Sequence, residues 1–120
     1  MPKNIKDKWV AALRSGDYKQ GREWLVVDDK YCCLGVLCDV VKDNFDLTLD
    51  NDAFIDSEGE RFPMVLPPVI ANAYFNGDRV PGVMMGTHED GTPYGEMISE
   101  VNDVFDYDFN QIADLIEAQY

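Results

Sequence analysis

Three cysteines, the only ones in the chain, lie within seven positions, at Cys32, Cys33 and Cys38. A zinc site needs four nitrogen, sulfur or oxygen donors, usually supplied as two C-x2-4-C pairs. Adjacent side chains on an extended strand point to opposite faces, so Cys32 and Cys33 are poorly placed to share an ion. The chain also has no C-x-x-C redox motif. Because unpaired cysteine is among the most buried residue types, we expect these residues in the core. A metal site and a reactive thiol are the alternatives.

The stretch from Asp106 to Glu117 is similar to a calcium-binding loop. Its residues at positions 1, 3, 5, 9 and 12 are of the ligand type that an EF-hand loop requires. Position 6, where such a loop needs glycine, is Gln111. The same stretch predicts a helix that begins with a capping box between Asp108 and Gln111. We therefore expect no metal, with a calcium loop as the alternative.

A short polar loop is the most suggestive candidate for a binding site. Between Arg14 and Arg22, the sequence RSGDYKQGR groups cationic, aromatic and amide side chains. Loops on a rigid scaffold often carry binding residues. Arg14, Lys19 and Arg22 are suited to hold a phosphate or a carboxylate, which Tyr18 and Gln20 would orient. The alternative is a structural crossing whose side chains bond to nearby backbone.

The sequence offers little else to a catalytic mechanism. His88, the only histidine, lies in the turn-rich stretch GTHEDG, which is typical of an exposed loop. A serine or cysteine triad would have to use this residue. Neither the phosphate-binding motif G-x-x-x-x-G-K-[ST] nor the nucleophile motif G-x-S-x-G occurs. We therefore assign no catalytic residue and no cofactor, and enzymatic activity is the less favoured interpretation.

The net charge is −13, and it is unevenly distributed. Residues 1–42 contain 8 Lys and Arg against 6 Asp and Glu, whereas residues 43–120 contain 2 against 17. Such a surface repels phosphates, so direct binding of nucleic acid is not expected. The charge either serves to keep the protein in solution or faces a basic partner.

The length of 120 residues and the hydrophobic content of 46% predict one globular domain over residues 1–120. No apolar stretch approaches the ~20 residues of a membrane helix. The N-terminal residues lack the apolar segment of a signal peptide. Together with the odd cysteine count, these features predict a cytoplasmic protein that does not bind membranes.

The elements that must position these residues are short. Apolar residues at helical spacing predict helices over residues 4–15, 34–41, 67–76, 96–105 and from 108 onward. Residues 24–33 and 53–62 predict hairpins, and residues 76–95, rich in Gly and Pro, predict a loop or a loose hairpin. Gly35, between apolar neighbours, predicts close packing of another element. The fold class is α+β, with four or five short helices packed on a small antiparallel sheet.

Four stretches together resemble a family of small bacteriophage proteins. They are WVAALRSGDYKQGREWL, YCCLGVLCDVV, LPPVIANAYFNG and VND…FNQIADLIE. The corresponding family patterns include W-x-x-A-L-x-S-G-x-Y-x-Q, Y-C-C-L-G-V-L-C and F-x-x-I-A-x-x-I. The resemblance covers most of the chain in order and is weakest at residues 41–63 and 80–95. It implies no particular activity. It implies a phage accessory protein that acts in the cytoplasm of the infected bacterium.

We therefore predict a non-enzymatic accessory protein that binds a host protein or a small ligand and interferes with host metabolism or defence. The first alternative is an acidic mimic of nucleic acid that occupies a basic groove of a host protein. The second is a small hydrolase or ligand-sequestering protein that uses the Arg14–Arg22 loop. The sequence leaves the partner and the oligomeric state open.

Overall fold

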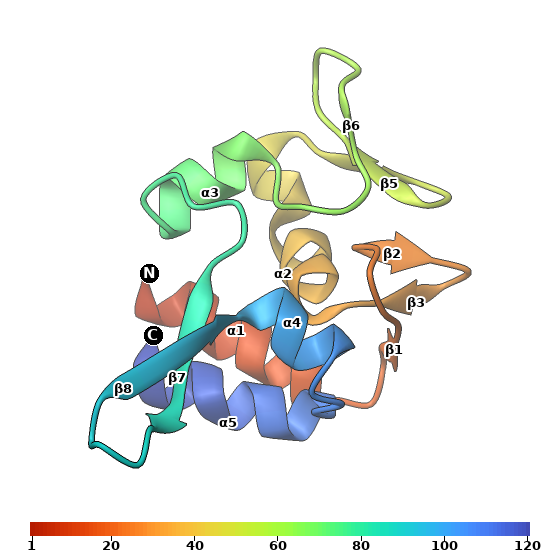
Figure 1. Ribbon diagram of the computed structural model, residues 1–120. Helices are drawn as coiled ribbons and strands as arrows, with labels where there is room; N and C mark the ends of the chain where they lie inside the picture. The colour runs from red at the N-terminus through yellow and green to blue at the C-terminus, as the bar shows by residue number, and fades with distance from the viewer.

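The computed structural model describes residues 1–120 and has the expected α+β fold, with short helices and small sheets (Figure 1). Its helices are α1 (Lys3–Arg14), α2 (Cys33–Val41), the 3-10 helix η1 (Lys42–Phe45), α3 (Pro68–Tyr74), α4 (Ile98–Asp103) and α5 (Phe109–Gln119). Its strands are β1 (Lys19–Gln20), β2 (Val26–Val27), β3 (Lys30–Tyr31), β4 (Thr48–Asp50), β5 (Ala53–Ile55), β6 (Arg61–Phe62), β7 (Gly82–Thr87) and β8 (Pro93–Met97).

The strands are divided among three small sheets, in the orders β1-β3-β2, β4-β5-β6 and β7-β8. Every pair is antiparallel except β1 with β3, which is parallel. The two hairpins expected from the sequence are present as β2–β3 and β5–β6. Asp28 and Asp29 join β2 to β3, and both have a positive φ, as the tight turn of a two-residue hairpin requires.

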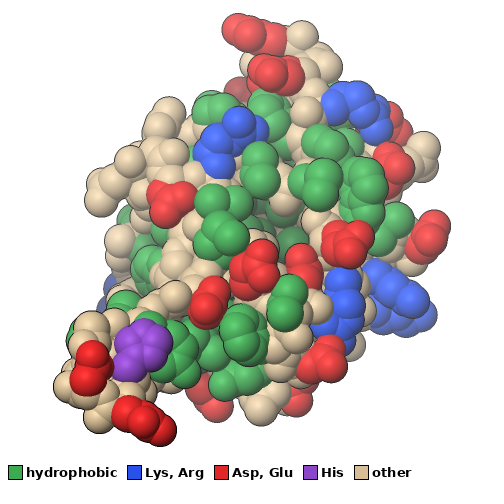
Figure 2. Space-filling view, viewed as in Figure 1, with side chains coloured by type: hydrophobic (Ala, Val, Ile, Leu, Met, Phe, Trp, Pro, Cys, Tyr) green, Lys and Arg blue, Asp and Glu red, His purple; other side chains and the backbone are tan.

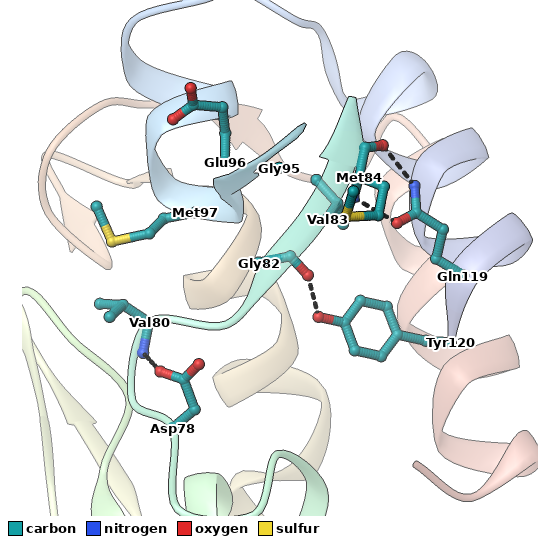
Figure 3. Close-up of a pocket in the computed structure, with 10 residues that line it drawn as sticks. All are labelled: Asp78, Val80, Gly82, Val83, Met84, Gly95, Glu96, Met97, Gln119 and Tyr120. Atoms are coloured by element: carbon teal, nitrogen blue, oxygen red, sulfur yellow. Dashed lines mark hydrogen bonds between the residues drawn. The ribbon is translucent and has the colours of Figure 1, made fainter. Parts of the chain in front are cut away.

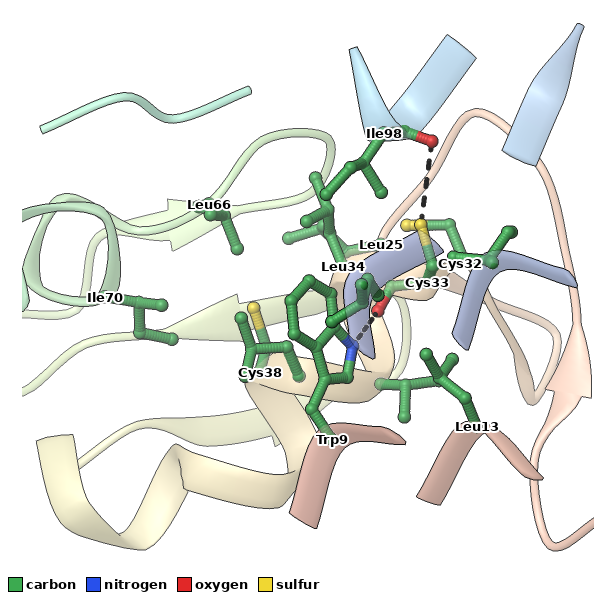
Figure 4. Close-up of a cluster of buried hydrophobic side chains, with 14 of the residues drawn as sticks. Trp9, Leu13, Leu25, Cys32, Cys33, Leu34, Cys38, Leu66, Ile70 and Ile98 are labelled. Atoms are coloured by element: carbon green, nitrogen blue, oxygen red, sulfur yellow. Dashed lines mark hydrogen bonds between the residues drawn. The ribbon is translucent and has the colours of Figure 1, made fainter. Parts of the chain in front are cut away.

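The core lies among the helices. α1 packs against α2 and α5, and its Trp9 is fully buried (Figure 4). The indole N–H of Trp9 donates to the Cys33 carbonyl at 2.9 Å, and the ring meets Phe75 edge-on with centroids 6.1 Å apart. A buried indole needs such a hydrogen-bond partner. The bond therefore fixes α1 against the first turn of α2.

Gly35 lies where α2 crosses the chain that leads into β2, which confirms the close packing expected at this residue. A Cβ atom at this position would lie 1.8 Å from the carbonyl oxygen of Leu25. The same Leu25 accepts a bond from the Cys32 N–H at 3.1 Å and donates to the Pro63 carbonyl at 2.8 Å. The backbone at Leu25 therefore joins the start of α2 to the segment after β6.

Residues 82–97 form the β7–β8 hairpin, so the 76–95 region is a hairpin over most of its length. The strand continues to Met97, which is also the N-cap residue of α4. This helix therefore begins at Ile98, two residues later than the sequence predicts. The hairpin projects at one end of the molecule with β7 against α5, and both termini lie nearby (Figure 1). None of the helices has the length and apolar character needed to cross a membrane.

Candidate binding surface

The predicted binding residues of the Arg14–Arg22 loop point to different elements. Arg14 reaches α5, where its guanidinium pairs with Asp114 at 2.5 Å and Glu117 at 2.8 Å. The Tyr18 hydroxyl donates to Asp39 of α2 at 2.5 Å. Burial, and then this carboxylate, raise the pKa of Tyr18. Lys19 is exposed on β1.

Gln20 and Arg22 are the two loop residues that the structure brings together, and both bond to Asn102 of α4. The Gln20 amide donates to the Asn102 side-chain oxygen at 3.0 Å and to the Tyr107 carbonyl at 2.7 Å. Arg22 donates to the Asn102 carbonyl at 2.9 Å and pairs with Asp106. The loop therefore spreads its side chains over α2, α4 and α5. Its role as a ligand site stays a prediction.

Asn102 is the buried polar residue at the centre of these contacts, and sequence reasoning missed it. Its amide donates to the Gly21 carbonyl at 2.8 Å and to the Asp103 carboxylate at 2.7 Å. Every polar atom of the side chain is thus paired, as a buried amide requires. The signals in the sequence are the polar pair Asn102-Asp103 in an otherwise amphipathic helix and the place of this pair in the stretch VND of the family resemblance.

The expectation that the cysteines belong to the core is confirmed. All three are buried as free thiols. Cys32 is the N-cap of α2 and its sulfur accepts a bond from the Gly35 N–H, while the Cys33 thiol lies 3.7 Å from the Ile98 carbonyl (Figure 4). Burial raises the pKa of Cys32 to about 11, and the pKa values of Cys33 and Cys38 rise well above the ordinary one. A nucleophile or metal ligand must be a thiolate, which this environment disfavours.

The acidic residues of the 106–117 stretch have other partners. Asp108 and Gln111 form the expected capping box, with reciprocal bonds of 2.8 and 2.9 Å. Asp106 pairs with Arg22, and Asp114 pairs with Arg14. No three His, Cys, Asp or Glu side chains gather in an arrangement suited to a metal ion.

His88 is exposed near the tip of the β7–β8 hairpin, as the sequence predicts. Its ring lies against Tyr94 with centroids 4.8 Å apart. Its backbone N–H donates to the Thr92 carbonyl at 2.8 Å, which closes the turn. The histidine therefore belongs to the hairpin turn.

A cleft of about 560 Å³ lies between the β7–β8 hairpin, residues 78–80 before it and residues 119–120 at the end of the chain. We call it the hairpin cleft. Figure 3 shows Val80 and Met97 on one side, Gln119 and Tyr120 on the other, and Gly82 between them. The cleft is open to solvent. On the face of the molecule drawn in Figure 2, apolar side chains are gathered with acidic ones among them.

Two glycines and two methionines shape the hairpin cleft. Gly82 and Met84 of β7 lie opposite Met97 and Gly95 of β8. A Cβ at Gly95 would lie 2.9 Å from the Val83 carbonyl oxygen, so this position has no room for a side chain. The methionines remain 48% and 40% exposed, at Met84 and Met97 respectively. The cleft is therefore an apolar surface that the chain itself leaves uncovered.

The end of α5 holds β7 in place beside the cleft. The Gln119 side chain accepts a bond from the Met84 N–H at 2.6 Å and donates to the Met84 carbonyl at 2.9 Å, as a neighbouring strand would. The Tyr120 hydroxyl donates to the Gly82 carbonyl. Burial, and then the nearby Asp78 carboxylate, raise the pKa of Tyr120, so this donor keeps its proton. The edge of β7 is thus closed by side chains.

Sequence reasoning placed no site in this hairpin. The available signal was Asp90-Gly91, a turn dipeptide between the flanking stretches GVMMGT and TPYGEM. Nothing in the sequence indicates that Gln119 and Tyr120 contact this hairpin, because they lie more than 20 residues further along the chain.

The whole chain, residues 1–120, matches the model of the family described as "Domain of unknown function (DUF8296)", and the chain belongs to that family. The comparisons with curated proteins and with solved structures give no match.

Proposed function

We propose that the protein is a non-enzymatic bacteriophage accessory protein that binds a host protein in the cytoplasm of the infected cell and interferes with host metabolism or defence. The observation that carries the binding role is the hairpin cleft, an uncovered apolar surface on a well-packed chain. Exposed apolar patches of this kind mark interaction sites. The phage origin rests on the sequence resemblance.

Native mass spectrometry of the protein, isolated gently from its infected host, tests this proposal. The expected result is a species whose mass equals this chain plus one host protein. A nucleotide or metal adduct in place of a host protein would contradict it. So would turnover of a nucleotide or peptide substrate that is lost on the substitution Arg22→Ala, which would favour the small hydrolase.

The acidic mimic of nucleic acid is the second candidate, and a specific feature favours it. A second hollow of about 280 Å³ is lined by Val27, Asp28, Asp29, Asn51 and Asp52. It therefore concentrates negative charge at one place on a chain whose residues 43–120 are already strongly acidic. A mimic should displace DNA from a basic host protein, and its binding should weaken steeply as salt rises. Binding that salt does not change would exclude this candidate.

A further inference from the structure

We propose that the hairpin cleft binds a segment of the partner protein that carries an apolar side chain next to a lysine or an arginine. This inference rests on the proposed function, because it states the chemistry of the partner that the proposal leaves open.

The preference of the cleft for an apolar side chain comes from its two methionines. Met84 and Met97 are half-exposed, and they lie opposite Gly95 and Gly82 across the hairpin. Methionine is unbranched and polarisable, so it adapts to apolar side chains of different shapes. Gly82 and Gly95 add no side chain of their own, so the methionines are the flexible apolar groups of the hairpin part of the cleft.

The shape of the cleft favours a segment of a macromolecule over a small molecule. Small-molecule sites bury most of the ligand surface in a concave pocket. The hairpin cleft, of about 560 Å³, is open to solvent and does not enclose a ligand. An extended segment can lie along such a surface and insert a single side chain.

The charge of the cleft selects a cationic segment. Asp78 and Glu96 line it, no lysine or arginine does, and neither carboxylate takes part in an ion pair. A lysine or arginine beside the apolar anchor would neutralise one of these charges in a partly desolvated place. A second copy of this chain is a poor match, since it carries the same charge of −13.

The first test is a titration of the isotope-labelled protein with a short peptide of alternating lysine and leucine, followed by NMR. The amide signals of Gly82, Gly95 and Met97 should shift. Matched peptides in which glutamate replaces lysine, or serine replaces leucine, should leave these signals in place. Shifts located elsewhere, or equal shifts with the glutamate peptide, would overturn the proposal.

Substitutions that keep the fold test the same site. The double variant Asp78→Asn, Glu96→Gln removes both charges, and the asparagine can still accept the Val80 N–H bond that Asp78 accepts at 3.0 Å. It should weaken peptide binding about tenfold or more and flatten the salt dependence. The control is Glu58→Gln, Glu60→Gln, which changes the net charge equally in the exposed loop before β6. Equal weakening by the control would mean that only net charge matters.

The final test uses the partner found by native mass spectrometry. Wild-type protein and the Glu58, Glu60 control should retain it, whereas the Asp78, Glu96 variant and Met84→Gln should lose it. If every variant retains the partner, the cleft assignment is wrong and the proposed function stands. If wild-type protein has no partner, the proposed function fails, and the peptide titration alone decides the cleft. A dimer that forms with rising concentration and is lost in the cleft variant would assign the cleft to a second copy.

Discussion

Single side chains in this protein link segments far apart in the sequence. Asn102 bonds to Gln20, Gly21 and Arg22, about eighty residues earlier in the chain. A buried polar group without partners costs about 1–3 kcal/mol, so a fully paired amide fixes one arrangement of the loop on α4. The polar residues of the Arg14–Arg22 loop are thus used, at least in part, to hold the structure.

Arg22→Ala tests this structural role against the predicted ligand role. Arg22 donates to the carbonyls of Asn102 and Asp103, at 2.9 and 3.0 Å. The Arg22 side chain is half exposed, so competition with water weakens these hydrogen bonds. We therefore expect Arg22→Ala to lower the free energy of unfolding by about 1 kcal/mol. Urea denaturation measures it. Lys19→Ala, in the same loop but without a side-chain partner, should change stability by less than about 0.5 kcal/mol. An equal change in the free energy of unfolding for the two variants would show that Arg22 has no structural role. A ligand site would then be the better explanation of this residue.

At the scale of the elements, the packing of α2 depends on one missing side chain. Replacing Gly35 by alanine would place a methyl group 1.8 Å from the Leu25 carbonyl oxygen. Backbone has to move to make room, and we expect a loss of at least about 1–3 kcal/mol in the free energy of unfolding. Guanidinium denaturation of the Gly35→Ala variant measures this loss, and the Gly86→Ala variant serves as the control. A Cβ at Gly86 would meet only the Tyr94 ring, at 3.6 Å, so this control should be close to neutral. A stable Gly35→Ala protein would show that α2 and the Leu25 segment are not tightly apposed.

The elements that sequence could predict are those fixed by neighbouring residues. The capping box of α5 needs only Asp108 and Gln111, and the β2–β3 hairpin needs only a short polar turn between β-branched and aromatic residues. The hairpin cleft could not be predicted in the same way. It needs Gln119 and Tyr120 to meet β7, and nothing near β7 in the sequence specifies which residues close its edge.

At the scale of the whole molecule, charge is distributed so that the basic N-terminal part partly neutralises the acidic body. Arg14 of α1 pairs with two carboxylates of α5, and Arg22 pairs with the acidic turn before α5. The two carboxylates at the face of the hairpin cleft, those of Asp78 and Glu96, have no such partners. Electrostatic attraction of a basic partner would therefore speed its association with this face.

The pH dependence of stability follows from the buried thiols of the core. Burial raises the pKa of Cys32 to about 11 in the folded protein from an ordinary value of 9.0, and it raises those of Cys33 and Cys38 well above that ordinary value. Below about pH 8 the thiols are almost fully protonated in both states and do not affect the pH profile. Above it, the unfolded chain releases protons that the folded protein retains, so the free energy of unfolding must fall as pH rises. Each thiol contributes at most about 1.4 kcal/mol per pH unit.

Guanidinium denaturation between pH 7 and pH 10 measures this effect, with Cys38→Ala as the matched variant. Wild-type stability should stay level up to about pH 8 and fall between about pH 9 and 10. The alanine variant leaves a small cavity, so its absolute stability is lower. Its slope above pH 9 should be shallower by the share of one thiol, while partly buried tyrosines such as Tyr18 and Tyr120, whose pKa values are also raised, contribute equally to both proteins. Identical slopes would mean that Cys38 is as accessible to water in the folded protein as in the unfolded chain. The cysteines would then no longer be simple core residues, and a reactive thiol would again be the leading alternative.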